Sequence, residues 1–184
     1  MKNLVLLTFA LLLSVSAHAN IDNASYLGIG AGNLLVNRGD IDSDVILGKD
    51  FILGYIFSNT VSLELAHTTG KKSDVKASIN DFPFEGDLRL KTTALYAVYR
   101  TTGPLFYLLK AGILQETVDL YVQYCGMIGG SNTCISGTES SRDTGLSIGV
   151  GAGWRLGDSI AIESEFSIIE QDVNYLSFGL NYRF

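Results

Sequence analysis

The sequence predicts an all-β protein: an eight-stranded antiparallel up-and-down transmembrane β-barrel, preceded by a cleavable signal peptide. Three observations predict this fold. Segments of about ten residues alternate apolar with small or polar residues, the connections between them alternate long and short, and the chain begins with an export signal. A tilted strand of roughly 9–11 residues is long enough to cross a bilayer. Short turns on one side and longer loops on the other are typical of outer-membrane barrels.

The front of the chain has the features of a secretory signal peptide. Lys2 precedes an apolar run at 4–15, and Ala17-His18-Ala19 fits the small-x-small cleavage pattern. A transmembrane helix is the alternative, but this run is shorter than the roughly 20 residues that a helical span requires. We therefore expect a signal peptide at 1–19 and one barrel domain at 20–184. The mature chain would carry a formal charge of −7, because Lys2 leaves with the signal peptide and all 19 acidic residues remain.

The first four strands are expected at 24–35, 47–57, 61–69 and 87–100. In the first strand, apolar residues alternate with glycines, and in the second and third strands they alternate with small or polar residues. The parity of the strand at 87–100 is ambiguous, so its facing stays open. The apolar residues that share one face of the first three strands are Leu27, Ile29, Ala31, Phe51, Leu53, Tyr55, Phe57, Val61, Leu63 and Leu65.

The last four strands are expected at 105–118, 143–156, 160–169 and 174–184. The strand at 143–156 has the clearest alternation, with apolar residues opposite a row of glycines. The strand at 174–184 places Leu176, Phe178, Leu180, Tyr182 and Phe184 on one face. The expected connections, in chain order, are 37–44, 58–60, 70–86, 101–104, 119–142, 157–159 and 170–172. The even number of strands predicts that both termini lie in the periplasm.

Six charged residues lie on the polar parity of the expected strands. They are Glu64, Lys110, Arg155, Glu163, Glu165 and Arg183, and Arg100 is a further candidate. A water-soluble lipocalin-like barrel also has eight strands, but its apolar residues would face inward. The interior of an eight-stranded barrel is just wide enough for side chains to fill, so inward carboxylates require cations. We expect a charge network there, either as a satisfied polar core or as a charge-gated narrow pore.

The strand and turn sequences resemble the small OmpA/OmpX-type outer-membrane β-barrel family. The residues that carry the resemblance are Gly54-Tyr-Ile-Phe57 before the turn at 58–60, Tyr99-Arg100 before the next turn, and the ending Tyr182-Arg-Phe184. The resemblance implies a place in the outer membrane of a Gram-negative bacterium. It also implies that Phe178, Leu180, Tyr182 and Phe184 form the signal read by the barrel-assembly machinery. Because the sequence ends at this signal, we expect no peptidoglycan-binding domain of the kind that follows the barrel in OmpA.

The two cysteines, Cys125 and Cys134, fall within the longest expected loop. An exported chain meets the oxidising periplasm, which favours a disulfide between them. The bond would close a small ring and stabilise the loop by roughly 2–3 kcal/mol on the chain-entropy model. Two thiols without a nearby histidine make a poor zinc set.

The other motifs point to no catalytic or cofactor site. His67 is the only histidine of the mature chain and lies on an apolar parity, which does not suit a nucleophile–base–acid set. The glycine repeats at 28–32 and 149–153 do not complete a dinucleotide-binding motif. Arg38-Gly39-Asp40 matches an integrin-type tripeptide, but short tripeptides recur by chance.

We therefore expect a structural or surface-interaction protein that acts through its extracellular loops. The alternatives are a narrow charge-gated pore and, third, a lipid-modifying enzyme. We expect no enzymatic activity and no cofactor. The expected partners are outer-membrane lipids and lipopolysaccharide, the assembly machinery and periplasmic chaperones, and a host or surface ligand at the loops. The acidic balance argues against nucleic acid, and we expect the barrel to be a monomer.

Overall fold

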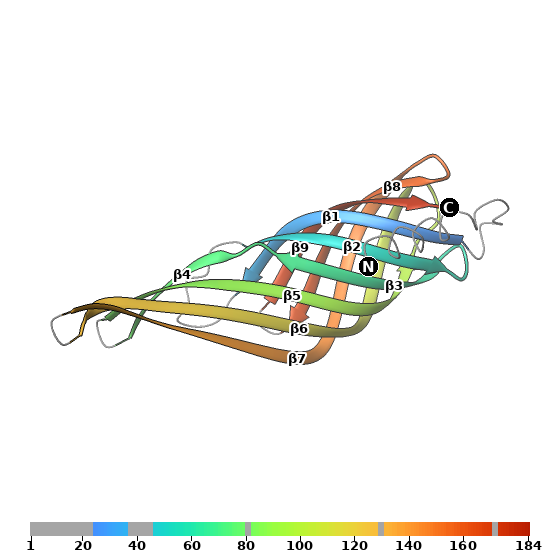
Figure 1. The fold of residues 1–184 in the computed structure, drawn as a ribbon. Coiled ribbons are helices and arrows are strands. Elements are labelled where there is room, and N and C mark those ends of the chain that lie inside the picture. Colours follow the sequence, from blue (N-terminus) through green and yellow to red (C-terminus); the bar gives the residue numbers. More distant parts are fainter. Residues whose placement is uncertain (1–23, 37–45, 80–81, 129–130, 171–172) are drawn as a thin grey trace, which may run out of the picture.

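A computed structural model describes residues 24–36, 46–79, 82–128, 131–170 and 173–184. The expected signal peptide at 1–19 and the tripeptide at 38–40 lie outside these ranges. Within them, no helix has the length and apolar character that a helical membrane span requires. The strands curve around a common axis to form a barrel, from which one hairpin projects far to one side (Figure 1).

Nine strands are present in the described residues. In chain order they are β1 (Ala24–Val36), β2 (Ile46–Ile56), β3 (Val61–Gly70), β4 (Ser73–Ile79), β5 (Phe82–Arg100), β6 (Leu105–Ile128), β7 (Ser131–Leu156), β8 (Ile160–Glu170) and β9 (Val173–Arg183). Each strand pairs with its neighbours in antiparallel fashion, β1 pairs with β9, and β3 pairs with β5. These pairings close a barrel of eight strands and leave β4 as an additional strand on the edge of β5. The predicted eight-stranded up-and-down barrel is confirmed.

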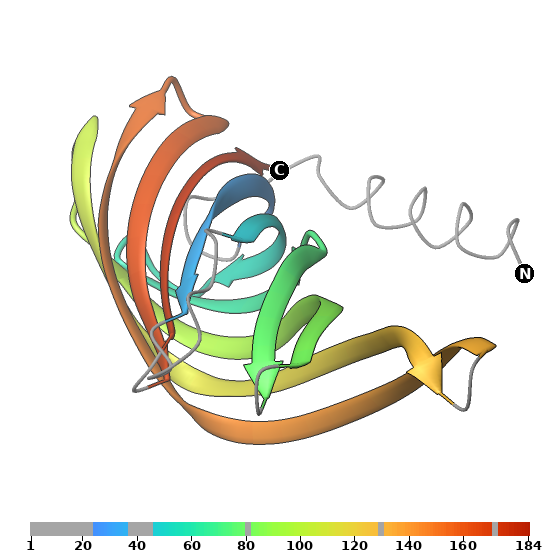
Figure 2. The same ribbon diagram turned by 90° about the vertical axis from the view of Figure 1, so that its left-hand side faces the viewer.

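Two predicted loops were wrong. The stretch at 70–86 contains β4 and the beginning of β5, and the stretch at 119–142 continues β6 and β7 as one long hairpin. Both stretches are polar, and polarity was the reason to predict loops. The stretch at 70–86 also contains Val75, Ile79, Phe82 and Phe84, and the stretch at 119–142 contains Val, Ile, Tyr and Thr residues, all of which favour extended backbone. A hairpin beyond the membrane can be polar on both faces, so its strands do not show the apolar alternation of the barrel wall. Figure 2 shows this hairpin leaving the barrel.

The two ends of the barrel differ in their connections. The turn end carries the short turns at 57–60, 101–104 and 157–159, together with Ala24 and Phe184. Gly103 and Gly157 have φ values of 106° and 82° in two of these turns, a conformation that glycine adopts without strain. The hairpin end carries the β4–β5 and β6–β7 hairpins.

Apolar side chains cover the outside of the barrel, as the parity predicted. Leu146 is 78% exposed, and Leu109 and Val150 are each more than half exposed. The sequence did not determine which face of β5 points outward. In the structure Leu95 and Tyr99 lie on the outer face, and Tyr96 and Val98 are buried on the inner face. Such an apolar outer surface is stable in lipid, where the closed sheet leaves no backbone group unpaired.

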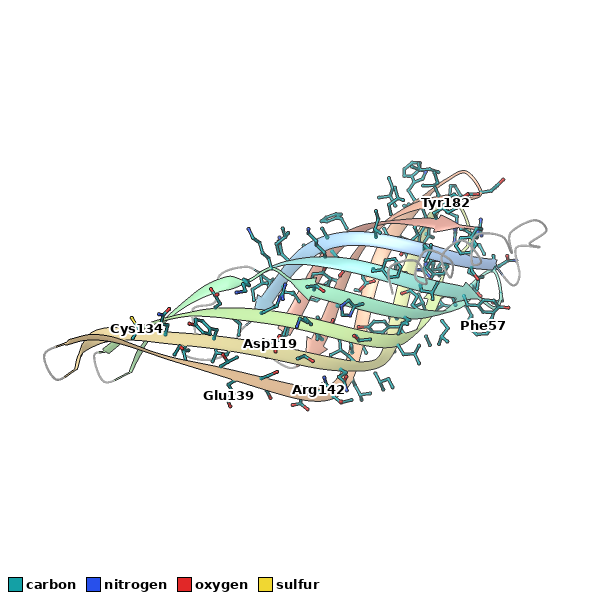
Figure 3. All side chains as sticks on the ribbon, viewed as in Figure 1. Phe57, Asp119, Cys134, Glu139, Arg142 and Tyr182 are labelled. Atoms are coloured by element: carbon teal, nitrogen blue, oxygen red, sulfur yellow. The ribbon has the colours of Figure 1, made fainter. Side chains whose placement is uncertain are left out.

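Aromatic residues form a ring around the turn end. Phe57 and Tyr182 lie at this end, opposite the projecting hairpin (Figure 3). The exposed members of the ring are Tyr55, Phe57, Tyr99, Tyr107, Trp154 and Tyr182. Aromatic girdles of this kind occupy the membrane–water interface in outer-membrane barrels. The ring therefore marks one boundary of the membrane-spanning belt.

Replacing Val150 with arginine should reduce the free energy of folding into lipid vesicles by about 2–4 kcal/mol. Val150 is 54% exposed on the lipid side of β7, so the new charge would lie in hydrocarbon. Gln115→Arg is the matched control, because Gln115 is exposed on the same outer face of β6 but nearer the hairpin end. It should cost at most about 1 kcal/mol, as expected near an interface. Denaturant titrations can measure both variants, and equal losses would contradict the proposed depth of the belt.

Candidate functional site

Glycines on the inner wall leave space for large side chains from neighbouring strands. Such a side chain passes over the glycine and contacts the strand beyond it. Tyr26 on β1, Gly54 on β2 and Glu64 on β3 are register partners in one row. The Tyr26 ring covers Gly54 so closely that a Cβ there would overlap it, and the Tyr26 hydroxyl donates a hydrogen bond to Glu64. The inner glycines therefore make room for side chains from the adjacent strand.

The same arrangement recurs elsewhere on the wall. Tyr96 on β5 passes over Gly112 on β6, and its hydroxyl donates to Ser147 Oγ on β7 at 2.9 Å. Lys110 on β6 passes over Gly149 on β7 in the same way. The glycine rows therefore set how far each polar side chain reaches around the lumen.

Arg100, at the turn end of β5, is the centre of the first ion-pair cluster. Its Nη2 lies 2.5 Å from Glu64 Oε1 and 3.0 Å from Glu163 Oε2, and its Nε lies 3.0 Å from Glu163 Oε1. Its Nη1 donates to Tyr26 Oη at 3.1 Å and to Ser62 Oγ at 2.9 Å. One guanidinium therefore neutralises two carboxylates from strands on different sides of the lumen. The side chains of Glu64 and Glu163 are only 2% and 10% exposed.

Lys110 and Glu165 form the second interior ion pair. The two side chains are 7% and 11% exposed. The Lys110 ammonium also lies over the Tyr96 ring, 4.1 Å from its centre, and Ser167 donates a hydrogen bond to Glu165. A buried ion pair is stable when hydrogen bonds satisfy the remaining polar atoms, and this pair has such partners.

A third polar group lies nearer the hairpin end and was missed at the sequence level. Asp50 on β2 accepts hydrogen bonds from Thr68 Oγ1 at 2.8 Å and from Tyr175 Oη at 2.7 Å. Asp50 shares the parity of Ile52 and Gly54, and this parity could have identified it as inward. The charge of the adjacent Lys49, which is exposed on the outside, obscured the pattern.

An apolar cluster fills the lumen at the hairpin end. Its most deeply buried members are Leu34, Ile46, Leu90, Leu114 and Ile169. These side chains come from β1, β2, β5, β6 and β8, so they meet from around the whole barrel. The cluster separates the polar interior from the surface on the hairpin side.

Arg155 and Arg183, which were predicted as members of the interior network, lie at its edge instead. Arg155 donates to the carbonyl oxygens of Gly103 and, at 3.2 Å, of Thr101. Arg183 donates from Nε to the carbonyl oxygen of Asp158 at 2.9 Å. Both residues end a strand beside a short turn, so their side chains reach the turn carbonyls before they reach a carboxylate of the lumen.

The two cysteines face each other across the β6–β7 hairpin. Cys125 and Cys134 are direct register partners. Opposite residues of an antiparallel pair have Cα atoms roughly 4.5–5.5 Å apart, within the range that a disulfide spans. Cys134 lies toward the tip of the projecting hairpin (Figure 3). The register is compatible with the predicted disulfide, which stays a prediction.

His67 lies on the outside of β3, away from the interior carboxylates. It is exposed, and its ring nitrogens hydrogen-bond to Thr93 Oγ1 at 2.9 Å and Thr69 Oγ1 at 3.2 Å. In the described part of the chain, no group of three or more His, Cys, Asp or Glu residues is placed to hold a metal ion.

Ion pairs also occur outside the membrane belt. On the hairpin side, Lys91 Nζ lies 2.8 Å from Asp119 Oδ2. The hydrogen bond from Lys91, together with one from Ser140, lowers the pKa of the Asp119 carboxyl below its ordinary value. Lys72 and Asp87 form a second pair at 3.0 Å. Exposed pairs of this kind contribute little stability. They are therefore not what stabilises the projecting sheet, which is formed by the β4–β5 and β6–β7 hairpins.

Comparisons with known proteins agree with this architecture. The family model of the outer membrane protein beta-barrel domain matches residues 5–184. Ail, the attachment invasion locus protein of Yersinia pestis, is 17% identical, with a TM-score of 0.58 over 89% of this chain and 99% of Ail. Neisserial surface protein A is 16% identical, with a TM-score of 0.61 over 87% and 97% of the two chains.

OprG of Pseudomonas aeruginosa is 10% identical, with a TM-score of 0.55 over 89% of this chain and 97% of OprG. None of the curated proteins compared with the chain matches it. At these identities, the solved structures establish a shared fold and nothing more specific.

Proposed function

Because the chain belongs to the outer membrane protein beta-barrel domain family, we propose that it is a monomeric anchor that binds surface partners through its projecting sheet. The barrel holds the protein in the outer membrane, and the hairpin end presents β4, β5, β6 and β7 beyond the apolar belt. In this proposal the turn end faces the periplasm. It carries the aromatic ring and the first and last residues of the barrel, Ala24 and Phe184. Long connections on the outer side are usual in such barrels.

The open edge of β7 is the observation that carries the proposal. β7 pairs with β6 from Ser131 to Leu156, but it pairs with β8 only from Ile148 onward. Among the described residues, the stretch at 131–147 therefore has a strand partner on one side only. Its residues at 136–144 are exposed and polar. An exposed strand edge presents unpaired N–H and C=O groups, onto which an extended polypeptide can add as a further strand.

Local charge indicates which partner suits this edge. A solved structure of Ail contains the heparin analogue sucrose octasulfate. In this chain, the stretch at 131–147 carries Glu139 and Asp143 against Arg142. A sulfated polyanion would meet a net negative edge, whereas an extended peptide would use backbone hydrogen bonds. We therefore propose a polypeptide ligand.

The test removes the edge and keeps the barrel. A variant in which Asn-Gly replaces residues 117–142 would join Glu116 to Asp143, which are register partners, through a two-residue turn, and would remove most of the edge. Folded barrels in lipid nanodiscs can be screened for binding to arrays of extended peptides and host surface proteins. The proposal predicts that partners bound by the natural chain are lost in the shortened one. A matched control shortens β4–β5 by replacing 74–87 in the same way, and should keep binding. Equal binding by all three proteins would contradict the proposal.

The alternative, a narrow pore, gains support from the interior charges but not from the apolar cluster above them. We expect no steady unitary conductance in planar bilayers, because Leu34, Ile46, Leu90 and Leu114 fill the lumen at the hairpin end. Single-channel recording of the natural chain checks this expectation. Recurrent unitary currents that disappear with unfolding would favour the pore instead.

Assembly in the membrane completes the proposal. Phe178, Leu180 and Tyr182 are exposed on the outer face of β9, and Phe184 follows them at the turn end. We propose that this face meets the assembly machinery during insertion and then outer-membrane lipid and lipopolysaccharide. A disulfide between Cys125 and Cys134 would hold the tip of the projecting hairpin.

A further inference from the structure

Four cations gather on the outer face of the barrel wall, where the apolar belt ends on the hairpin side. They are Lys49 on β2, Lys71 just after β3, and Arg89 and Lys91 on β5, and we call them the cationic patch. Lys49, Lys71 and Arg89 are exposed, and Lys91 is half-buried. The patch shares no residue with the β7 edge that carries the proposed surface function. It therefore raises a separate question, which is what its charges bind.

The strand register brings the four side chains onto one area of the wall. Lys49 and Lys91 flank Thr69, which is the register partner of both. Lys71 follows Thr69 by two residues, and its N–H donates to a backbone carbonyl oxygen of β2 at 2.7 Å, so it continues the ladder on the outer face. Arg89 shares the outer face with Lys91 for the same reason of parity. Lys71 and Arg89 lie between the last β3–β5 pair and the first β4–β5 pair, so they are neighbours.

The position of these residues along their strands places the patch at a membrane boundary. Tyr99, a member of the aromatic ring at the turn end, follows Lys91 by eight residues and Arg89 by ten. Along a tilted strand these separations correspond to roughly 20 and 25 Å across the membrane, and the apolar belt of an outer-membrane barrel is about 25 Å tall. Lys49 is only six residues from Tyr55, so its backbone lies deeper. A lysine can extend its apolar stem along lipid, which brings the Lys49 ammonium to the same level.

Most of the positive charge of the patch has no partner within the described residues. Lys91 pairs with Asp119 at 2.8 Å, whereas Lys49, Lys71 and Arg89 take part in no ion pair there. Asp119 lies between the hairpin tip and the turn end (Figure 3). Four cations against one carboxylate leave a formal charge of +3 on this area of a chain whose formal charge is −6.

The charge is local to this side of the barrel. The neighbouring Lys72 and Asp87 pair with each other and add no net charge. On the opposite side of the wall, the outward residues of β8 from 160 to 168 and of β9 from 174 to 182 are uncharged, Phe166 and Phe178 among them. An anion in the membrane would therefore be attracted to the β2, β3 and β5 side rather than to the whole circumference.

We propose that the cationic patch binds a membrane lipid whose head group carries two phosphates, the chemistry of the lipid A part of lipopolysaccharide. Ammonium and guanidinium groups form charge-assisted hydrogen bonds with phosphate oxygens. The cations spread over three strands, roughly 10 Å at the spacing of neighbouring strands, which is wider than one phosphate group. A charge of +3 also matches two phosphates better than the single negative charge of a simple phospholipid.

The wall beneath the patch suits the acyl chains of the same lipid. Leu53, Leu65 and Leu95 form one row of register partners on the outer face, and each is more than a third exposed. A free phosphate would use only the charges, whereas a lipid would use both surfaces. The orientation proposed above, with the hairpin end outside, places this lipid in the outer leaflet. The binding itself does not depend on the polypeptide ligand of the β7 edge.

The test measures lipid binding to the folded chain in uncharged maltoside micelles by native mass spectrometry, with diphosphoryl lipid A as the probe. Lys49→Gln combined with Arg89→Gln should raise the dissociation constant by at least about tenfold, since each cation near an anionic lipid contributes roughly fivefold. Lys49→Arg combined with Arg89→Lys keeps both charges and should bind as tightly as the natural chain. Arg155→Gln combined with Arg183→Gln removes two cations at the turn end and should leave the constant unchanged. Heat-modifiable gel migration verifies that each variant is folded.

Lipids with other head groups and free phosphate test the chemistry of the ligand. Monophosphoryl lipid A and phosphatidylglycerol should both bind more weakly than diphosphoryl lipid A, and inorganic phosphate should not displace the lipid. Equal binding of phosphatidylglycerol would overturn the two-phosphate assignment, and displacement by inorganic phosphate would overturn the lipid assignment. An unchanged constant in the Lys49→Gln and Arg89→Gln pair would show that the patch is not the site. Polypeptide binding at the β7 edge should be the same in this pair as in the natural chain, so the two proposals fail separately.

Discussion

Replacing Arg100 with methionine should lower the free energy of unfolding in lipid vesicles by about 3–5 kcal/mol. The substitution removes the only cation that lies within ion-pair distance of both Glu64 and Glu163 in the described structure. Both carboxylates would remain almost fully buried without a counter-charge. Methionine preserves most of the side-chain volume, so the loss would report charge rather than a cavity.

Two further variants separate this effect from a general loss of charge. Glu163→Gln in the Arg100→Met background should restore part of the loss, because it removes one of the two stranded carboxylates. Arg89→Met is a control, since Arg89 is exposed on β5 beyond the apolar belt. Urea titrations of vesicle-folded protein give all four free energies. A loss below about 1 kcal/mol for Arg100→Met, the range of surface pairs, would show that the cluster contributes little.

The barrel itself could be predicted because its wall obeys one rule. Each strand faces lipid on one side and a polar lumen on the other, so a period of two assigns both faces at once. Leu146, Ile148 and Val150 face outward for this reason, and Glu64, Lys110 and Glu163 face inward. The same rule fails beyond the membrane, where β6 and β7 have water on both faces. Residues 119–142 show no alternation of apolar and polar residues, so a loop was predicted there.

The partners within the lumen could not be predicted, because they depend on the relative height of side chains on different strands. Parity placed Glu64, Glu163 and Glu165 inside but did not say which cation each would meet. Height depends on the stagger between strands, and a sequence does not contain this stagger directly. Arg100 was only a candidate for this reason, yet it joins two carboxylates. Arg155 and Arg183 had the right parity but lie level with the turns.

The separation of the interior into distinct clusters has a consequence for function. Arg100 balances Glu64 and Glu163, Lys110 balances Glu165, and Asp50 is satisfied by two hydroxyls. An ion crossing the lumen would have to break these pairs and then pass the apolar cluster. The arrangement favours a rigid, closed anchor over a conducting pore. A rigid barrel is also what the proposed edge of β7 needs, because β-strand addition depends on a fixed backbone.

Replacing Lys110 with methionine should also destabilise the barrel strongly, by an amount on the order of 3 kcal/mol. Lys110 is the cation paired with Glu165, and its ammonium lies over the Tyr96 ring. Without it, Glu165 keeps the hydrogen bond from Ser167 but no positive partner. The sequence left three carboxylates as possible partners of Lys110, and the ion pair in the structure identifies one of them.

A double-mutant cycle tests that pairing. Glu165→Gln in the Lys110→Met background should recover part of the loss, with a coupling energy between about 0.5 and 3 kcal/mol. Glu64→Gln in the same background is the matched control. It should give less recovery, because Glu64 is in direct contact with Arg100 and Tyr26, whereas Lys110 forms its direct ion pair with Glu165. Coupling of Lys110 to Glu64 but not to Glu165 would mean that the two clusters exchange partners in the membrane. The lumen would then rearrange as a charge-gated pore requires, and the closed-anchor interpretation would have to be abandoned.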